Sequence, residues 1–177
     1  MLTTTEASIR TGTILALCYS PELINGVGKV AHNSAQVTKW GIPTDRHYGE
    51  TRVNSRHQTV PNDRPITIVG VEAVRDACAQ LGIEEIPIGG LGENFLVEGL
   101  GDLSDVEPGD RFEVVSPDRE VKIVLDAWLQ NPPCVSLSIY HKQIVKTLYG
   151  KRGLLCTVSK EGMVSVGDKI ELHRKGS

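Results

Sequence analysis

Short apolar runs separated by glycine and proline account for most of the chain. Residues 9–18 alternate between two sets of side chains, which is typical of a β-strand. Other runs alternate in the same way or are rich in β-branched residues, and turn-forming residues bound them. The segments that predict strands are 9–18, 35–40, 65–69, 94–97, 111–114, 121–128, 154–158 and 169–172.

Two segments show helical rather than strand spacing. Residues 71–81 carry apolar side chains at helical intervals, and Gly82 follows as a stop signal. Residues 137–148 show a similar spacing, which predicts a second helix directly after Cys134. The chain is therefore expected to contain two helices among many strands.

A turn containing Gly-Asp leads into a strand twice, at residues 106–114 and 164–172. Two such units are too few for a repeat architecture, but they suggest two β-ribbons used alike. The many strands and turns predict a mostly β fold, a closed or partly open β-barrel with a few attached helices. No linker or low-complexity segment interrupts the pattern, so residues 1–177 are expected to form one domain.

The charge balance argues against some function classes. The chain has 19 Lys and Arg against 22 Asp and Glu, a net charge of −3. This lacks the basic excess typical of proteins that bind nucleic acid. The N-terminal segment does not have the pattern of a secretory signal, and no apolar stretch is long enough to span a bilayer. We expect a cytoplasmic protein that binds neither nucleic acid nor membranes.

The four cysteines are Cys18, Cys78, Cys134 and Cys156. No two of them are spaced as Cys-x-x-Cys, so neither a zinc ribbon nor a redox dithiol is predicted. Reduced thiols are the default in the cytoplasm. Cys78 lies on the apolar stripe of the first helix, and Cys156 on the apolar face of a strand. Both are therefore expected in the core.

The segment Asn131-Pro132-Pro133-Cys134 most directly suggests chemistry. Prolines have a fixed φ and no N–H group, so they end the preceding strand and hold the next residue in a defined place. Cys134 would then lie at the start of the second helix, where unpaired N–H groups favour a negative charge. A thiolate there would be a nucleophile and a metal ligand. The alternative is an unreactive cysteine packed beneath the helix.

Three polar segments could serve such a site. Asp45-Arg46-His47 offers a planar cation for oxyanions and an imidazole, and Asp45 could cap a turn or orient Arg46. Arg64 precedes a buried strand and could project into a cavity. The glycine-rich segment 89–92 could hold an anion with its backbone N–H groups. Each also has a simpler explanation, as a polar loop, a surface arginine and a tight turn.

Other templates do not match. Segment 89–92 lacks the Gly-Lys-Ser/Thr ending of a nucleotide-binding loop and precedes a strand rather than a helix. The five histidines do not show zinc-ligand spacing with the cysteines, and no Gly-x-Ser-x-Gly sequence is present. A catalytic pair of Cys134 and His47 could form in three dimensions, but the spacing along the chain does not show it.

Taken in order, several short motifs resemble those of the MOSC family, the C-terminal domain type of molybdenum cofactor sulfurases. They are Asp45-Arg46-His47, Asp63-Arg64 before a strand and a helix bearing Glu72, Gly92-Glu93-Asn94, Gly109-Asp110, Pro133-Cys134 and Gly167-Asp168. The resemblance covers most of the chain. The family usually has glycine where this chain has Thr44. Because no desulfurase domain accompanies it, the chain is similar to the stand-alone bacterial members.

The resemblance implies a β-barrel with a pocket near the Pro-Cys segment. In the family, the cysteine carries sulfur or binds the molybdenum of the molybdopterin cofactor. Cys134 would then be both the catalytic residue and the metal ligand. The residues implied to bind the cofactor are Arg46, His47, Arg64, Gly92 and Asn94.

Three functions remain open on this basis. The first is reduction of a small N-hydroxylated base or amidoxime by a molybdenum enzyme, with a separate electron-donor protein because no flavin or iron–sulfur motif is present. The second is a transfer module in which Cys134 receives a persulfide from a sulfur-donor protein. The third is a small-molecule-binding barrel that uses segment 89–92 without thiol chemistry.

Overall fold

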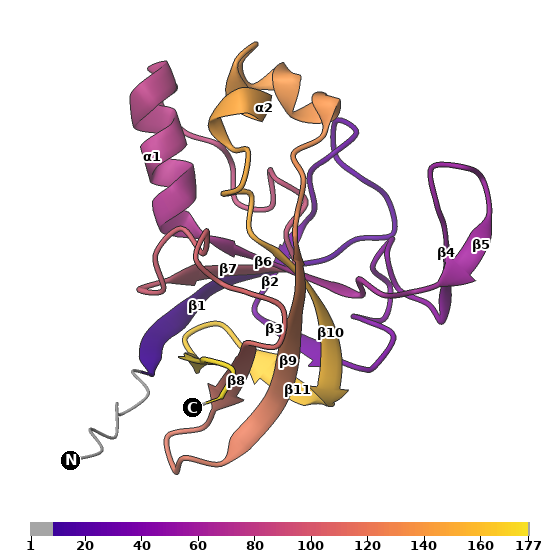
Figure 1. The fold of residues 1–177 in the computed structure, drawn as a ribbon, viewed down its shortest axis with the longest axis vertical. Helices are drawn as coiled ribbons and strands as arrows, with labels where there is room; N and C mark the ends of the chain where they lie inside the picture. Colours follow the sequence, from indigo (N-terminus) through magenta and orange to yellow (C-terminus); the bar gives the residue numbers. More distant parts are fainter. Residues whose placement is uncertain (1–8, 177) are drawn as a thin grey trace.

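A computed structural model describes residues 9–176 (Figure 1). The elements are β1 (Arg10–Cys18), β2 (Ala31–His32), β3 (Ser34–Val37), β4 (Thr51–Val53), β5 (Thr59–Pro61), β6 (Ile66–Gly70), α1 (Val71–Leu81), β7 (Phe95–Glu98), β8 (Arg111–Val115), β9 (Val121–Gln130), the 3-10 helix η1 (Val135–Ile139), α2 (Ile144–Thr147), β10 (Leu154–Lys160), β11 (Gly162–Ser165) and β12 (Lys169–His173). None of the helices in this range is long and apolar enough to cross a membrane.

Seven strands form a closed barrel. They follow the order β12-β8-β9-β10-β6-β7-β1, and β1 pairs with β12 to complete the ring. The neighbours are antiparallel except β6 and β7, which are parallel and are joined through α1, as a parallel pair requires a crossover. Closure removes exposed strand edges. The predicted mostly β barrel with a few attached helices is thereby confirmed.

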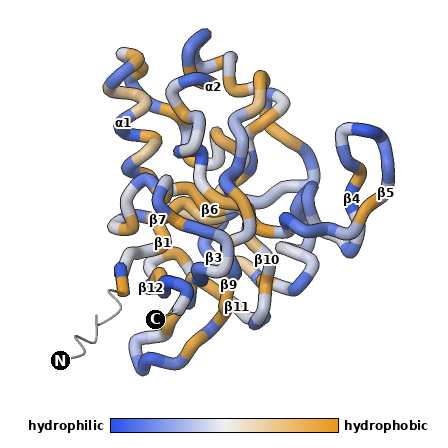
Figure 2. The backbone as a smooth tube through the Cα atoms, in the orientation of Figure 1, coloured by the Kyte–Doolittle hydropathy of each residue, from blue (hydrophilic) through white to orange (hydrophobic). Residues whose placement is uncertain are grey.

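Apolar side chains fill two regions, one inside the barrel and one between its outer wall and the helices. Ile14, Phe95 and Phe112 belong to the interior cluster, whereas Cys18 and Leu137 belong to the outer cluster. The last residues of β1 are buried on both faces, because one face lines the interior and the other lies under the helices. Hydrophilic residues gather instead in the outer turns and the tip of the β4–β5 hairpin (Figure 2).

Helix α1 has the predicted bounds. Ala73, Ala77 and Cys78 face the barrel. Gly82 ends the helix with φ 66°, in the left-handed region where glycine has no steric penalty. The expected core positions of Cys78 and Cys156 are also confirmed, since both side chains are buried.

The second predicted helix is wrong. Residues 137–148 do not form one helix; a 3-10 turn, η1, is followed by the one-turn helix α2. The apolar spacing is nonetheless meaningful, because Leu137, Ile144 and Leu148 are fully buried in the outer cluster. Two successive turns bring the same residues to the core that a continuous helix would. The strand expected at 35–40 also ends early, at Val37.

The two Gly-Asp units are used alike. Asp110 accepts a hydrogen bond from Glu107 N (2.9 Å), and Asp168 accepts one from Ser165 N (2.8 Å), so each aspartate closes its own turn. The strands that follow, β8 and β12, pair directly with each other. Outside the barrel, β3 pairs with β11, and the β4–β5 hairpin stands away from the body of the molecule (Figure 1).

Candidate functional site

Cys134 lies at a hollow of about 230 Å³, which we call the thiol pocket. It is lined by Leu23, Gly26, Val27, His47, Arg64, Thr67, Gly92, Asn131, Cys134, Arg152 and Leu155. These residues come from separate loops and from the starts of β6 and β10. Of the four cysteines, Cys134 alone is exposed. The structure thus brings together four of the predicted site residues: Cys134, His47, Arg64 and Gly92.

The chain places Cys134 by local means at the end of β9. Asn131 N bonds to Gly153 O (2.8 Å), which extends the sheet by one residue. Pro132 and Pro133 follow and cannot donate to the sheet. Cys134 then precedes η1 in an extended conformation. Because η1 has only five residues, the expected support of a thiolate by a long helix does not hold.

Positive charge near the thiol comes instead from arginine side chains, and sequence analysis missed the more buried one. Arg152 is 9% exposed and lines the thiol pocket. Its Nη1 donates to Pro132 O and its Nη2 to Leu91 O, both at 2.8 Å. Its Nε is buried and has no hydrogen-bond partner. Among residues 9–176, no carboxylate forms an ion pair with this guanidinium.

The glycine next to Arg152, Gly153, is the local sequence feature that could have drawn attention to this arginine. Gly153 has φ +93°, and a Cβ there would lie 1.9 Å from Ile68 O. Only glycine fits where this loop presses against β6. Arg152 is thereby held directly over the Pro-Cys segment. Sequence alone gave no reason to connect this glycine with Cys134, which lies 19 positions earlier.

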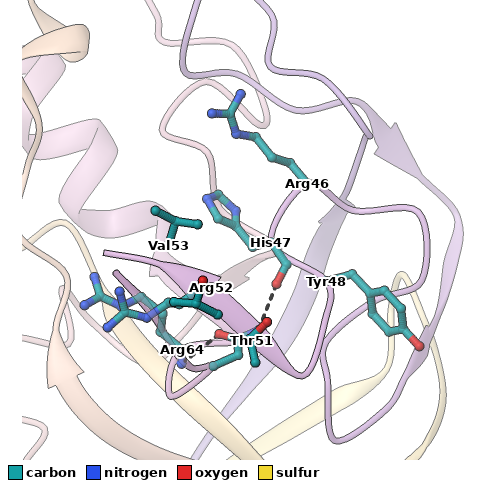
Figure 3. A pocket seen from close by; sticks show the side chains of 9 residues that line it. Arg46, His47, Tyr48, Thr51, Arg52, Val53 and Arg64 are labelled. Carbon is teal, nitrogen blue, oxygen red and sulfur yellow. Dashed lines mark hydrogen bonds between the residues drawn. The ribbon is translucent and has the colours of Figure 1, made fainter. Parts of the chain in front are cut away.

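Arg64 links the thiol pocket to a second hollow of about 450 Å³, the arginine pocket (Figure 3). The arginine pocket is lined by Arg46, His47, Tyr48, Thr51, Arg52, Val53, Thr59, Asn62 and Arg64. The side chains of Arg52 and Arg64 extend side by side there (Figure 3). His47 and Arg64 line both hollows, so the predicted residues Arg46 and Cys134 face adjoining parts of one site.

The carboxylate of Asp63 contacts both Arg52 and Arg64. Arg52 Nε bonds to Asp63 Oδ1 at 2.8 Å, and Arg64 Nε lies 3.5 Å from the same oxygen. The hydrogen bond from Arg52 lowers the pKa of Asp63 below its usual range. The Nε of Arg64 is buried and makes no hydrogen bond. With Arg46 added, three arginines surround a hollow that has one nearby aspartate, which favours an anionic ligand.

His47 is held by a buried ion pair that sequence analysis did not anticipate. Lys29 Nζ lies 3.0 Å from Asp45 Oδ2, and both side chains are almost fully inaccessible. The same oxygen accepts a hydrogen bond from His47 N (3.2 Å) and lies 3.7 Å from His47 Nδ1. Asp45 therefore orients His47 rather than Arg46. The other carboxylate oxygen of Asp45, Oδ1, accepts a hydrogen bond from Ser20 N (3.2 Å).

The charges of this pair are set by opposing effects. Burial alone would raise the pKa of Asp45, but the contacts with His47 and the charge of Lys29 outweigh it and lower the pKa below its usual range. Burial lowers the pKa of Lys29, and the Asp45 carboxylate opposes that effect. The result is a buried carboxylate that stays charged and gives the His47 loop a fixed anchor.

The family usually has glycine where this chain has Thr44, and the backbone at Thr44 has a conformation typical of glycine. Thr44 has φ +69°, in the left-handed region, although it is β-branched. This is the conformation that a glycine would adopt without strain. The loop therefore retains a glycine-type geometry ahead of Asp45 despite the threonine side chain. Two backbone hydrogen bonds hold this loop. Asp45 N donates to Ile42 O, and Tyr48 N donates to Asp45 O.

The glycine-rich segment does not bind an external anion through its backbone. Glu93 accepts hydrogen bonds from Gly89 N (2.8 Å) and Leu91 N (3.0 Å). Gly90 N and Gly92 N donate to backbone carbonyls within the same turn. All four N–H groups are occupied, so the anion-binding interpretation of segment 89–92 is wrong. Burial raises the pKa of Glu93, opposed by these N–H groups.

Gly92 and Asn94 contribute to the site in different ways. Gly92 lines the thiol pocket with φ +79°, and a Cβ there would lie 2.8 Å from Val27 O. Asn94 is buried and lines neither hollow. Its Nδ2 donates to Cys18 O (3.0 Å), and its Oδ1 accepts from Thr67 N (3.1 Å). This arrangement does not support direct cofactor contact by Asn94; the residue instead holds the backbone of Thr67, which lines the thiol pocket.

The fold and site define a small closed barrel with an exposed cysteine in an arginine-lined hollow. The model of the MOSC domain family matches residues 43–171. YuaD of Bacillus subtilis (strain 168) is 30% identical over 151 residues, which cover 75% of this chain and 76% of YuaD. The chain therefore belongs to the MOSC domain family.

Solved structures agree with this assignment. The crystal structure of YuaD matches with a TM-score of 0.82 at 25% identity, covering 94% of this chain and 98% of YuaD. YiiM from Geobacillus stearothermophilus matches with a TM-score of 0.66 at 22% identity, covering 93% of this chain and 76% of YiiM, which shows a shared fold. YuaD carries the name of a metal-sulfur cluster biosynthesis protein.

Proposed function

We propose that the thiol pocket and the arginine pocket together bind a molybdenum cofactor, that Cys134 is the sulfur ligand of the metal, and that the protein reduces small N-hydroxylated compounds. The observation that carries this proposal is the buried guanidinium of Arg152, which has no carboxylate partner among residues 9–176 and lies at the same hollow as the exposed thiol. A buried cation without a counter-ion is costly, so the site favours an anion.

The residues present fit such a group. A thiolate is a soft ligand suited to this metal chemistry, and Cys134 is the accessible thiol. Arg46, Arg52 and Arg64 offer planar donors suited to a phosphate. The two hollows share His47 and Arg64, so a cofactor larger than either could extend across both. A simple sulfur carrier would not require the second hollow.

The chain's own residues have separable roles. Arg64 and Arg152 would hold and neutralise the anionic group, and Gly92 leaves space beside it. His47 points its Nδ1 toward Asp45, which leaves its Nε2 free to exchange a proton. Loss of a hydroxyl as water consumes two electrons and two protons, and His47 can deliver a proton to the departing oxygen. The cofactor, when bound, supplies the two-electron chemistry, with electrons from a donor protein.

Expression in a host that makes the cofactor tests this proposal. We expect about one molybdenum per wild-type chain, pterin fluorescence in the released cofactor, and reduction of an amidoxime with a chemical reductant. Cys134→Ser should lose the metal and the activity. Arg152→Gln should retain roughly tenfold less cofactor, as expected when a charge-assisted contact is removed. Cys78→Ala is the matched control, because this thiol is buried on α1, lines neither hollow, and its loss should leave loading unchanged.

Two results would contradict the proposal. One is full molybdenum content and activity in Cys134→Ser. The other is wild-type protein that stays without molybdenum after incubation with the isolated cofactor, when a known molybdenum enzyme loads under the same conditions. Circular dichroism of each variant shows whether a lost cofactor reflects a lost fold.

A second candidate function is persulfide transfer by Cys134. It is supported by the exposed thiol and by the name of YuaD, which refers to metal-sulfur cluster biosynthesis. A persulfide on Cys134 would be an anion beside Arg152, so the same charges serve it. Incubation with a cysteine desulfurase and cysteine, followed by mass spectrometry, should then show a gain of roughly 32 Da on Cys134 without bound molybdenum. Failure to gain this mass would exclude the transfer function.

A further inference from the structure

Three potential metal ligands share the outer face of the barrel on β8 and β12. Glu113 on β8 lies directly opposite Glu171 on β12, and His173 follows two residues later on the same face. The intervening Leu172 points into the barrel. These strands lie at the other end of the molecule from α1 and α2 (Figure 1, Figure 2). None of the three residues lines the thiol pocket or the arginine pocket.

Two arginines fix the outer oxygens of the carboxylates. Arg111 Nε lies 3.1 Å from Glu113 Oε1, and Arg119 pairs with Glu171 Oε1. The other oxygen of each carboxylate, Oε2, is left facing the imidazole of His173. Two carboxylates directly opposite each other on neighbouring strands repel, so positive charge between the inner oxygens would stabilise this arrangement. Both arginines are more than half exposed, and solvent screens their charge.

The inner atoms converge on one point. His173 Nε2 lies 3.5 Å from Glu113 Oε2 and 3.3 Å from Glu171 Oε2, and all three atoms lie within 4.8 Å of one another. Bonds of about 2.0–2.2 Å from a tetrahedral Zn²⁺ place its ligand atoms roughly 3.3–3.6 Å apart. The two distances from His173 match the edges of such a tetrahedron.

An unpartnered atom points into the same space. His173 Nε2 is buried and makes no hydrogen bond, although it is an atom that must either donate or accept one. Its distances to the carboxylate oxygens exceed those of ordinary hydrogen bonds. A metal ion bound to Nε2 would satisfy this atom and separate the two carboxylates at the same time.

We propose that Glu113, Glu171 and His173 form a binding site for a divalent transition metal, with Zn²⁺ as the best fit. One imidazole and two carboxylates suit zinc better than magnesium or calcium, which prefer oxygen ligands alone. Arg111 and Arg119 orient the ligands by holding their outer oxygens, as outer partners commonly do around metals. Because the ligands come from two strands of the closing barrel, a bound ion would fasten β8 to β12.

Zinc titration of the full chain tests the site. Cys134→Ser is used throughout, so that the exposed thiol does not bind the metal. After removal of metals with EDTA, we expect one Zn²⁺ per chain by calorimetry and a rise in Tm of roughly 5 °C or more at saturating zinc. His173→Gln and Glu171→Gln should each weaken the affinity for zinc at least tenfold. Co²⁺ in place of zinc should give the visible absorption of a tetrahedral site.

A matched control is available on β7. Glu98 forms a pair with Arg75 (2.7 Å) and has no histidine among its ion-pair partners. Glu98→Gln should leave zinc affinity unchanged. In the alternative, no metal binds and His173 is protonated, so that its imidazolium pairs with both carboxylates.

Two outcomes would overturn the metal site. One is the absence of saturable zinc binding in the Cys134→Ser chain, which would indicate the protonated histidine instead. The other is zinc binding of equal affinity in His173→Gln. If His173→Gln does not fold without metal, Glu113→Gln provides the same test, because it removes one ligand and leaves the imidazole in place. Neither outcome bears on Cys134, so the two proposals fail separately.

Discussion

The thiol pocket and the barrel interior each contain a cysteine side chain, but the first is exposed and the second is buried. Cys156 on β10 is fully buried among apolar residues, and burial raises its pKa. Cys134 is exposed at a hollow lined by Arg64, Arg152 and His47. The comparison shows that position in the fold, rather than residue type, decides which thiol can react.

Cys18 is as fully buried as Cys156. It ends β1, just beneath the loops of the site, yet its side chain is fully buried. Burial raises its pKa to about 12, with a further contribution from the charge of Glu93. The backbone of Cys18 serves the site, because its carbonyl accepts the hydrogen bond that holds Asn94. Cys18 therefore serves the site through its backbone, while its thiol stays buried in the outer cluster.

The largest expected effect is selective alkylation. Native protein treated with iodoacetamide should be modified at Cys134 roughly a thousandfold faster than at Cys156, because the core thiol reacts only after unfolding, which costs at least several kcal/mol. Peptide mass mapping over time measures both rates. In urea the four cysteines should react alike. Comparable rates for Cys134 and Cys156 in the native protein would contradict the comparison.

The next effect concerns the buried ion pair that anchors His47. Lys29→Met leaves Asp45 buried without its cation and should lower the free energy of unfolding by about 3–5 kcal/mol. Adding Asp45→Asn should recover much of this loss, since the uncompensated charge is then removed. Arg75→Gln, which breaks an exposed pair, should cost less than about 1 kcal/mol. Urea denaturation compares the three; equal losses for Lys29→Met and Arg75→Gln would contradict the assignment.

The same ion pair sets a pH dependence. The folded-state pKa of Asp45 lies below its unfolded value. Its contribution to stability is therefore complete above about pH 4 and is lost as the pH falls toward the folded-state pKa. The double variant Lys29→Met/Asp45→Asn should show a shallower loss of stability in acid than the wild type.

The smallest effect is at Thr44. Thr44→Gly removes the strain of a left-handed β-branched residue but adds flexibility to the unfolded chain, so a net gain below about 1 kcal/mol is expected. Thr38→Gly is the control, because Thr38 Oγ1 makes two turn hydrogen bonds and its backbone has no positive φ. Thr38→Gly should destabilise the protein. A loss of stability in Thr44→Gly, measured by thermal unfolding, would contradict the strain argument.

Local patterns were sufficient for most elements of the barrel. The alternation in residues 9–18 and the helical spacing ended by Gly82 both correspond to structure, because each pattern reflects one buried face of one element. The apolar spacing of residues 137–148 was correct about burial but wrong about helix length. Periodicity reports which side chains are buried, and two short turns can bury the same set.

The candidate site was only partly predictable. Cys134 was identified from the adjacent prolines, and three other proposed site residues, His47, Arg64 and Gly92, line its pocket. Arg152 and Lys29 were missed because neither belongs to a local motif; each gains its role from a contact across the fold. The glycine-rich segment was misread, since two of its N–H groups are occupied by Glu93, only two to four residues away, and the other two by backbone carbonyls of the same turn.

By itself, the sequence determined most strands of the barrel, the first helix, the mostly β class and the choice of Cys134 as the candidate residue, because these depend on side-chain period, turn residues and proline stiffness over a few neighbouring positions. Only the tertiary structure decided which cations surround that thiol, which aspartate holds His47, and that Glu113, Glu171 and His173 converge. Those arrangements depend on barrel closure, which brings residues far apart in the chain within a few ångströms, and no local pattern encodes such distances.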